Sequence, residues 1–388
     1  MRNHRFRRRI VPVAAMGGLA VLGSLVTPGP DSVADAITSR VRPPADPVQQ
    51  RLDGLVRDDG FPAALAAVRD RSGRVRNYTA GVSDLTTRAK VPVDGQVRIG
   101  SNTKTFTSVV VLQLVGEGKV GLDQPIETYL PKLIRGNGID GRHITVRQLL
   151  QHTSGLPNYT NFLANGFLPF QHTYFEPREL LDMALAQKAD FEPGTKWEYS
   201  NTNYVVLGLL IEKITSRPLV EEITQRVIDR AGLRHTYFPN VGDQTIHERH
   251  PHGYTRDKPD QPLTDVTELD PSWGWAAGQM VATPSDVDRF LSALLGGRLL
   301  KPAQLNEMRR TVDAPGLWPG ARYGLGLIST PLSCGGLAWG HGGDIDGYHS
   351  SDAATDDGRA ATVAVTRLPE TDGQINHLQA AIDSALCG

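Results

Sequence analysis

The chain has only two cysteines among its 388 residues, Cys334 and Cys387. So few cysteines exclude a disulfide-rich scaffold and a cysteine-based zinc cluster. The 41 basic and 42 acidic residues give a formal net charge of −1, which provides no electrostatic footprint for nucleic acid. The sequence also lacks a P-loop and a dinucleotide-binding fingerprint, and Ser154 does not lie in a G-x-S-x-G elbow. A composition of 39% hydrophobic and 21% charged residues is that of an ordinary globular protein.

The N-terminus has the order of a secretory signal. Five arginines lie among the first nine residues, an uncharged and mostly apolar stretch follows from Ile10 to Val26, and Ala34-Asp35-Ala36 offers a cleavage site. This order predicts a signal peptide over residues 1–36 and a secreted protein, and it leaves Sec and twin-arginine export both open. The apolar stretch is short and contains proline and glycine, which disfavours a permanent membrane span. Residues 37–48 are rich in proline and predict a linker.

Secretion would place Cys334 and Cys387 in an oxidising compartment. A Cys334–Cys387 disulfide would attach the C-terminal helix to the end of a strand hairpin, and we favour this pairing. Two unrelated buried thiols are the alternative.

Hydrophobic patterns predict a strand-rich region at each end of the domain that spans residues 49–388. Strands are expected at 62–69, 74–81, 96–99, 323–328, 337–340 and 361–366. Helices are expected after Ser101 and at 146–151, 177–187, 204–214, 221–231, 283–295 and 374–386. We therefore predict an α+β fold with a mainly helical subdomain inserted at about 116–272.

Ser101 and Lys104 form the only S-x-x-K pattern in the chain, at the start of a predicted helix. One helical turn brings the lysine amine beside the serine hydroxyl. A serine hydroxyl needs a base to become a nucleophile, and a desolvated lysine can act as that base. Taken alone, the pattern is more often a helix-capping serine with a surface lysine.

Two further elements contain groups that can move protons. Tyr199-Ser200-Asn201 lies in a loop before an apolar helix, where a phenol could relay a proton and an amide could hold Lys104. Tyr159-Thr160-Asn161 has the same pattern, so the pattern alone decides little. His341-Gly342-Gly343 is the only H-x-G in the chain; its glycines would let a substrate approach, and the next backbone N–H could form half of an oxyanion hole. Seen alone, it is a glycine-rich hairpin.

In this order the three elements resemble the serine penicillin-recognising hydrolases, namely class C β-lactamases and the secreted D-alanyl-D-alanine carboxypeptidases of actinomycetes. The sequence context around Ser101, residues 144–156, 199–204 and 323–327 also matches, and the resemblance spans about residues 45–388. It implies an antiparallel β-sheet flanked by helices with an inserted helical subdomain. The chain ending also resembles the carboxypeptidase branch, whose disulfide would fall at Cys334 and Cys387.

The resemblance assigns a role to each motif residue. Ser101 would be the acylated nucleophile, and Lys104 and Tyr199 would share the proton transfers, with the acylation base left open. Asn201 would orient Lys104 and the substrate, and His341 would help to set the charge state of Tyr199. The remaining assignments are the backbone N–H groups of Ser101 and Asp344 as the oxyanion hole, and Trp273, Gly342 and Gly343 as substrate-binding residues.

The chain departs from the carboxypeptidases at the subsite for a terminal carboxylate. Relatives place hydroxyl residues and an arginine there, whereas this chain has Gly342, Asp344 and Ile328. A carboxylate about 4 Å from Asp344 would be repelled by about 1–4 kcal/mol. This departure predicts a substrate that has no free carboxylate at this end or that ends in an amine, such as a D-amino-acid amide, a D-aminopeptide or an ester.

The sequence thus favours a secreted serine hydrolase, first a D-alanyl-D-alanine carboxypeptidase that acts on peptidoglycan peptides and is acylated by penicillins. A D-amidase, aminopeptidase or esterase of the same fold is the second hypothesis, and a sensor that binds β-lactams or muropeptides without turnover is the third. We expect a monomer with no cofactor, metal, nucleic-acid partner or membrane span. His247, His250 and His252 are interpreted as solvated loop residues, because no acidic partner lies at zinc-protease spacing.

Overall fold

The computed structural model describes residues 46–388, apart from the side chains of residues 164 and 165. The predicted signal peptide lies outside the described residues, as does nearly all of the predicted linker. The linker prediction is wrong at its end, because Pro47 and Val48 already belong to helix α1 (Pro47–Arg57). Asp46 caps this helix through its side chain, and Pro47 occupies the first turn, where its missing N–H costs nothing. Residues 45–388 form one compact unit.

An antiparallel sheet forms the centre of the described chain. Its strand order is β2-β1-β15-β14-β12-β11-β10-β9. Strand β13 follows β12 in the chain and pairs with the same strand, β14. The strands are β1 (Ala63–Arg69), β2 (Val75–Gly81), β9 (Val312–Asp313), β10 (Arg322–Tyr323), β11 (Ile328–Pro331), β12 (Leu337–Gly340), β13 (Gly342–Ile345), β14 (Tyr348–Ala354) and β15 (Ala360–Val365). Strands from the two ends of the chain therefore pair directly, β1 with β15.

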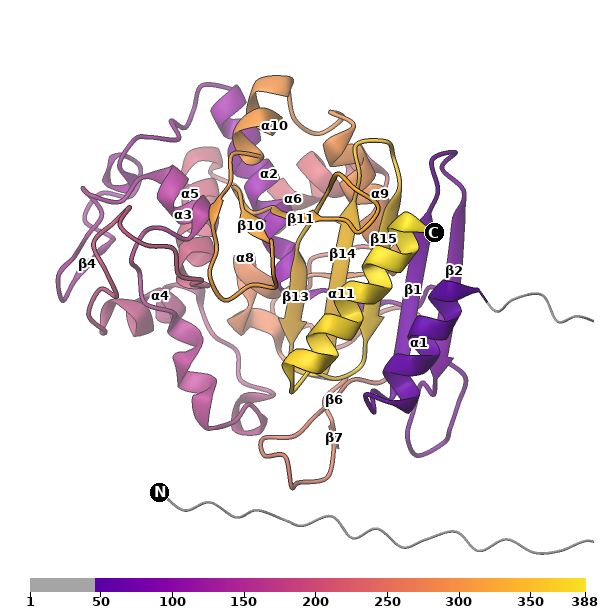
Figure 1. Cartoon of the computed structure of the whole chain (residues 1–388). Helices are drawn as coiled ribbons and strands as arrows, with labels where there is room; N and C mark the ends of the chain where they lie inside the picture. The colour runs from indigo at the N-terminus through magenta and orange to yellow at the C-terminus, as the bar shows by residue number, and fades with distance from the viewer. Residues whose placement is uncertain (1–45) are drawn as a thin grey trace, which may run out of the picture. The chain divides into compact units, whose positions relative to one another are not determined.

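Helices cover both faces of the sheet. Helix α11 (Asp372–Cys387) lies across one face with α1 beside it, and their apolar residues pack on β1 and β15 (Figure 1). Helices α2 (Thr103–Gly116) and α9 (Pro284–Leu295) belong to the larger core on the other side, with α8 (Trp275–Gly278) and α10 (Pro302–Met308). This arrangement confirms the predicted α+β fold with an antiparallel sheet flanked by helices.

Between α2 and α8 the chain is mainly helical. It forms α3 (Val146–Gln151), α4 (Pro177–Leu185), α5 (Thr202–Thr215), α6 (Leu219–Ile223), a π-helical turn η5 (Thr224–Ile228) and α7 (Asp229–Ala231). Its strands are two residues long: β4 (Arg135–Gly136), β5 (Ile139–Asp140), β6 (Tyr254–Thr255) and β7 (Thr264–Asp265); β3 (Val97–Arg98) and β8 (Val281–Ala282) pair nearby. The remaining helices are of the 3₁₀ type: η1 (Gly100–Asn102), η2 (Ile126–Thr128), η3 (Tyr159–Asn165), η4 (Leu168–Phe170) and η6 (Pro271–Trp273). The boundaries 116–272 stay a prediction.

One predicted strand is wrong in its middle. Residues 324–327 form a tight turn between β10 and β11, in which Gly324 N–H donates to the carbonyl of Leu327 at 2.7 Å. Gly326 has a φ of +74°, and a Cβ there would lie 2.0 Å from Ser108 Oγ. Only glycine meets both demands, so the two glycines break an apolar run that otherwise reads as one strand.

The predicted disulfide is confirmed between Cys334, in the turn that joins β11 to β12, and Cys387, the last residue of α11. Closing a loop of 53 residues stabilises the fold by about 3–5 kcal/mol in the chain-entropy account. The bridge therefore anchors α11 to the sheet, and α11 contributes Ile375 and Gln379 to the wall of the cleft described below.

Candidate active site

Ser101 lies in η1, the short helical turn that joins β3 to α2. Gly100 before it has a φ of +48°, and a Cβ there would lie 2.6 Å from the carbonyl oxygen of Asp344. Strand β13 therefore rests directly against the turn that carries the serine. This contact brings the backbone of Asp344 close to Ser101, as an oxyanion hole made from their two N–H groups requires.

Lys104 is fully buried beneath Ser101. Its Nζ lies 2.8 Å from Ser101 Oγ, 2.7 Å from Asn201 Oδ1 and 2.7 Å from the carbonyl of Ala277. Burial lowers the pKa of the Lys104 amine well below its usual range, although the charge of Asp344 acts in the opposite direction. In the neutral amine, two N–H groups serve Asn201 and Ala277, and the lone pair is left to accept the Ser101 proton.

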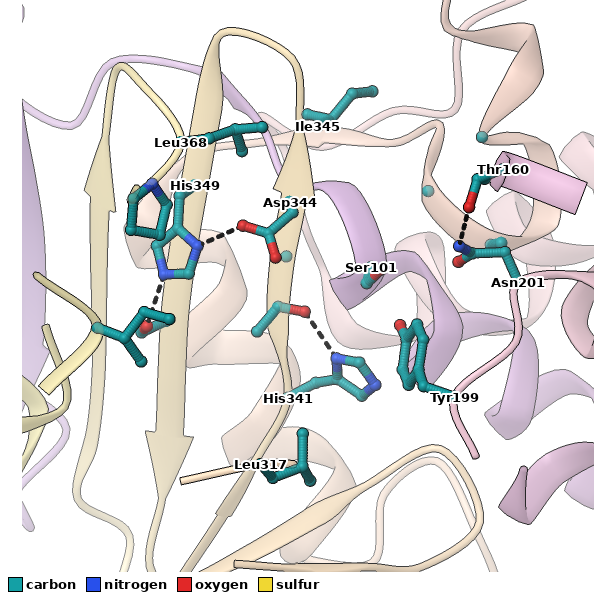
Figure 2. Close-up of a pocket in the computed structure, with 18 of the residues that line it drawn as sticks. Ser101, Thr160, Tyr199, Asn201, Leu317, His341, Asp344, Ile345, His349 and Leu368 are labelled. Atoms are coloured by element: carbon teal, nitrogen blue, oxygen red, sulfur yellow. Dashed lines mark hydrogen bonds and ion pairs between the residues drawn. The ribbon is translucent and has the colours of Figure 1, made fainter. Parts of the chain in front are cut away.

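The phenol of Tyr199 also lies next to Ser101. Lys104 Nζ is 4.9 Å from the centre of the Tyr199 ring, and Figure 2 shows the phenol oxygen pointing toward Ser101. Burial raises the pKa of the Tyr199 phenol well above its usual value, and this effect exceeds the opposing hydrogen bond with Ser101. The site therefore holds a phenol that keeps its proton next to an amine that readily loses its own.

Asn201 is held from behind. Its Nδ2 donates to Thr160 Oγ1 at 3.4 Å (Figure 2) and to Asn158 Oδ1 at 3.3 Å. This leaves Oδ1 to accept from Lys104. Tyr159, the competing Y-x-N tyrosine, instead donates its hydroxyl to the carbonyl of Trp273. The structure thus brings Tyr199 to Ser101 and leaves Tyr159 in the cleft wall beside Trp273.

His341 is the end of a directed chain of hydrogen bonds. Its Nδ1 donates to the carbonyl of Gly342 at 2.6 Å, so its Nε2 accepts from Tyr323 Oη at 2.9 Å. Tyr323 Oη in turn lies 3.1 Å from His152 Nε2. Burial lowers the pKa of His341 to about 3, so the imidazole is neutral. His341 therefore faces Tyr323 through its Nε2, and its ring centre lies 6.4 Å from that of Tyr199.

Sequence reasoning included His152 and Tyr323 only as context and missed their contacts with the site. His152 has a left-handed backbone, with φ at +61°, and its ring centre is 4.3 Å from that of Tyr199. Its Nδ1 accepts from Ser200 N–H at 3.2 Å and from Asn203 Nδ2 at 3.0 Å, which explains how the strained backbone is held. The sequence offered one signal for this role: a histidine follows the predicted helix 146–151, at a position that normally suits glycine or asparagine.

Gly343 controls the distance between β13 and Ser101. A Cβ at this position would lie 1.9 Å from the carbonyl of Ile99 and 3.0 Å from Ser101 N, whereas a Cβ at Gly342 would meet only the carbonyl of Ser350, at 3.4 Å. We expect Gly343→Ala to push β13 away and to lower kcat/KM by about 100-fold, because small displacements of reacting groups cost that much. Gly342→Ala is the matched control and should lower kcat/KM far less. Steady-state kinetics, with circular dichroism to verify folding, will check both; equal losses would contradict this reading.

The groups described above open into a cleft of about 620 Å³. Trp273, Gly342, Gly343 and Asp344 line it, together with Ile328. Of the described residues 46–388, two aspartates, Asp344 and Asp346, line the cleft and no lysine or arginine does. An apolar group of residues, Leu317, Trp318 and Ile328, forms the wall near His341 and Tyr199.

The loop histidines lie away from the cleft. His247 pairs with Asp243 at 2.7 Å and His252 with Asp265 at 2.6 Å, while His250 contacts the carbonyl of Glu248. Within residues 46–388, no group of three or more histidine, cysteine, aspartate or glutamate side chains is arranged to hold a metal ion. Over the same residues, no helix is both long and apolar enough to span a membrane.

The fold and the serine–lysine–tyrosine cluster define a class, the serine hydrolases built on an antiparallel sheet with an inserted helical region. The Beta-lactamase family matches residues 48–384, so the chain belongs to that family.

Relatives of known structure are similar over nearly the whole described chain. A D-stereospecific amidohydrolase from Streptomyces sp. is 40% identical with a TM-score of 0.81, covering 88% of this chain and 98% of that one. The D-amino acid amidase from Ochrobactrum anthropi SV3, complexed with D-phenylalanine, is 28% identical with a TM-score of 0.75, covering 87% and 97%. Protein flp of Staphylococcus aureus (strain MW2) is 26% identical over 204 residues, which are 52% of this chain and only 40% of that protein.

Proposed function

We propose that the protein is a secreted D-stereospecific amidohydrolase that cleaves D-amino-acid amides or short D-aminopeptides through an acyl-enzyme on Ser101. The charge of the cleft carries this proposal: of the residues in 46–388 that line it, none is a lysine or arginine and Asp344 is ionised, while burial raises the pKa of Asp346 to about 7. A substrate with a free terminal carboxylate would have no cation to meet it and would be repelled by Asp344. The 40% identity to a D-stereospecific amidohydrolase supports the same assignment.

The D-alanyl-D-alanine carboxypeptidase hypothesis is therefore placed second. The family and the motif residues are compatible with a carboxypeptidase. They are also compatible with acylation of the protein by penicillins. Ile328 occupies the position at which carboxypeptidases carry an arginine, and it lies in an apolar cluster with Ala314 and Tyr323. An apolar wall at the leaving-group end suits a neutral amide better than a carboxylate.

In the proposed acylation, Ser101 Oγ attacks the amide carbonyl and its proton passes to the neutral amine of Lys104. Lys104 is favoured over Tyr199 as the base, because burial favours the uncharged form of both groups. The backbone N–H groups of Ser101 and Asp344 stabilise the oxyanion. Tyr199 donates its proton to the leaving nitrogen and recovers one from Lys104, and the C–N bond breaks. A water molecule then attacks the ester, again with Lys104 as base, which releases the D-amino acid and restores Ser101.

The test compares matched amide and acid substrates. We expect D-phenylalanine amide to be hydrolysed and its L-isomer to be a poor substrate. The dipeptide D-Ala-D-Ala should be cleaved about 10- to 100-fold less efficiently than its C-terminal amide, because only the free acid carries a carboxylate that the charge of Asp344 repels. Ammonia release and chromatography of the products give kcat/KM for each. A strong preference for the free acid would overturn the amidase assignment and favour the carboxypeptidase.

A further inference from the structure

Asp344 is the end of a hydrogen-bonded array that runs from α11 into the cleft. Gln379 Nε2 donates to Ser351 Oγ at 3.4 Å, and Ser351 Oγ lies 3.0 Å from His349 Nε2. His349 Nδ1 donates to Asp344 Oδ1 at 2.6 Å (Figure 2). His349 Nδ1 donates to Asp344 in either protonation state of the ring, so the array ends at the carboxylate.

The order serine, histidine, aspartate is that of a catalytic triad, but the exposure of the three groups is reversed. Ser351 is only 2% exposed and lies behind His349, whereas the side chain of Asp344 is 66% exposed. A substrate can therefore reach the carboxylate and not the hydroxyl. The array is suited to hold a carboxylate in place rather than to activate a second nucleophile.

The carboxylate of Asp344 is ionised and has room for a ligand. Desolvation opposes its ionisation, but the charge and the hydrogen bond of His349 outweigh that effect and leave the pKa of Asp344 below its usual value. Oδ1 is occupied by His349, and Oδ2 forms no hydrogen bond with any residue in 46–388.

We propose that Asp344 binds the free α-ammonium group of the substrate, and that His349 and Ser351 are positioning residues that hold its carboxylate. This inference rests on the proposed function and narrows the substrates to D-amino-acid derivatives with an unmodified amino group. In such a substrate the ammonium nitrogen is two bonds from the carbonyl carbon. A residue that offers its backbone N–H to the carbonyl oxygen can therefore reach the ammonium with its side chain.

The decisive comparison is D-phenylalanine amide against N-acetyl-D-phenylalanine amide, with the full chain and its Asp344→Asn variant. At about pH 6.5 the free α-amino group is protonated, since its ordinary pKa is about 7.7–8.0. We expect the wild type to favour the free amine by roughly 10- to 100-fold in kcat/KM. Asp344→Asn should bring this ratio close to one by raising KM for the charged substrate alone. An unchanged ratio in the variant would overturn the inference.

Two further variants separate recognition from folding. Glu248→Gln removes a carboxylate that pairs with His235 at 2.8 Å outside the cleft, and it should leave the ratio unchanged. Ser351→Ala should lower the ratio several-fold, with kcat for the acetylated amide retained. A loss of activity on both amides alike would overturn the positioning role. If the wild type hydrolyses neither amide, the proposed function fails as well; if it hydrolyses both equally, only this inference fails.

Discussion

Replacing Ser101 with alanine is expected to lower kcat for D-phenylalanine amide by roughly 10⁴- to 10⁶-fold, the range found when a nucleophile is removed from a cooperating catalytic set. The structure offers no substitute in place, because Lys104 Nζ is bonded to Ser101 Oγ, Asn201 and Ala277 and to no other hydroxyl. The variant should fold normally, since Ser101 makes no side-chain cap to its helix. Ammonia release under steady-state conditions will measure the loss.

Covalent labelling provides a second measurement of the same variant. A serine-reactive fluorophosphonate probe should add one covalent mass to the wild-type chain and none to Ser101→Ala. Ser285→Ala is the control: this serine also lies at the start of a helix, in α9, and binds Asp94 outside the cleft. It should keep both turnover and labelling. A labelled Ser101→Ala chain would show that another residue is acylated and would invalidate the mechanism.

The features that depend on local spacing could be predicted from the sequence. The contact between Ser101 and Lys104 requires only one helical turn, and the observed 2.8 Å distance agrees with it. The disulfide required only two cysteines in an oxidising setting. Choosing Tyr199 over Tyr159 was different, because both begin a Y-x-N pattern and only their distant partners distinguish them. That choice depended on the family resemblance.

Features that depend on buried polar contacts could not be predicted. Strand β14 was missed because its sequence, Tyr348-His349-Ser350-Ser351-Asp352-Ala353-Ala354, is buried along its whole length yet has no hydrophobic alternation. Two of its polar side chains find partners on other segments: Asn102 Nδ2 donates to Ser350, and His349 donates to Asp344. Such partners come from segments far apart in the chain, so no local pattern reveals them. The same reason hid the contact between His152 and Tyr323.

Lys104→Arg is the second substitution with a large expected effect, and it tests the assignment of the base. Arginine stays protonated at every pH at which the protein is folded, so it cannot accept the Ser101 proton. We expect kcat to fall by roughly 10³- to 10⁴-fold. In the wild type, kcat/KM should rise with pH until Lys104 is neutral and then reach a plateau, at a pH well below 10.5 because burial lowers the Lys104 pKa. The variant should lack this rise.

The control for this substitution is Lys119→Arg, where the lysine is exposed and pairs with Glu117 just beyond the end of α2. It should retain wild-type activity and the wild-type pH profile, so that a loss at Lys104 reflects its position and not the exchange itself. A Lys104→Arg enzyme that keeps a tenth of the activity would exclude the lysine as base. The phenol of Tyr199 would then have to act as the base, ionising despite its burial with the charge of the guanidinium at position 104 beside its ring to stabilise the phenolate.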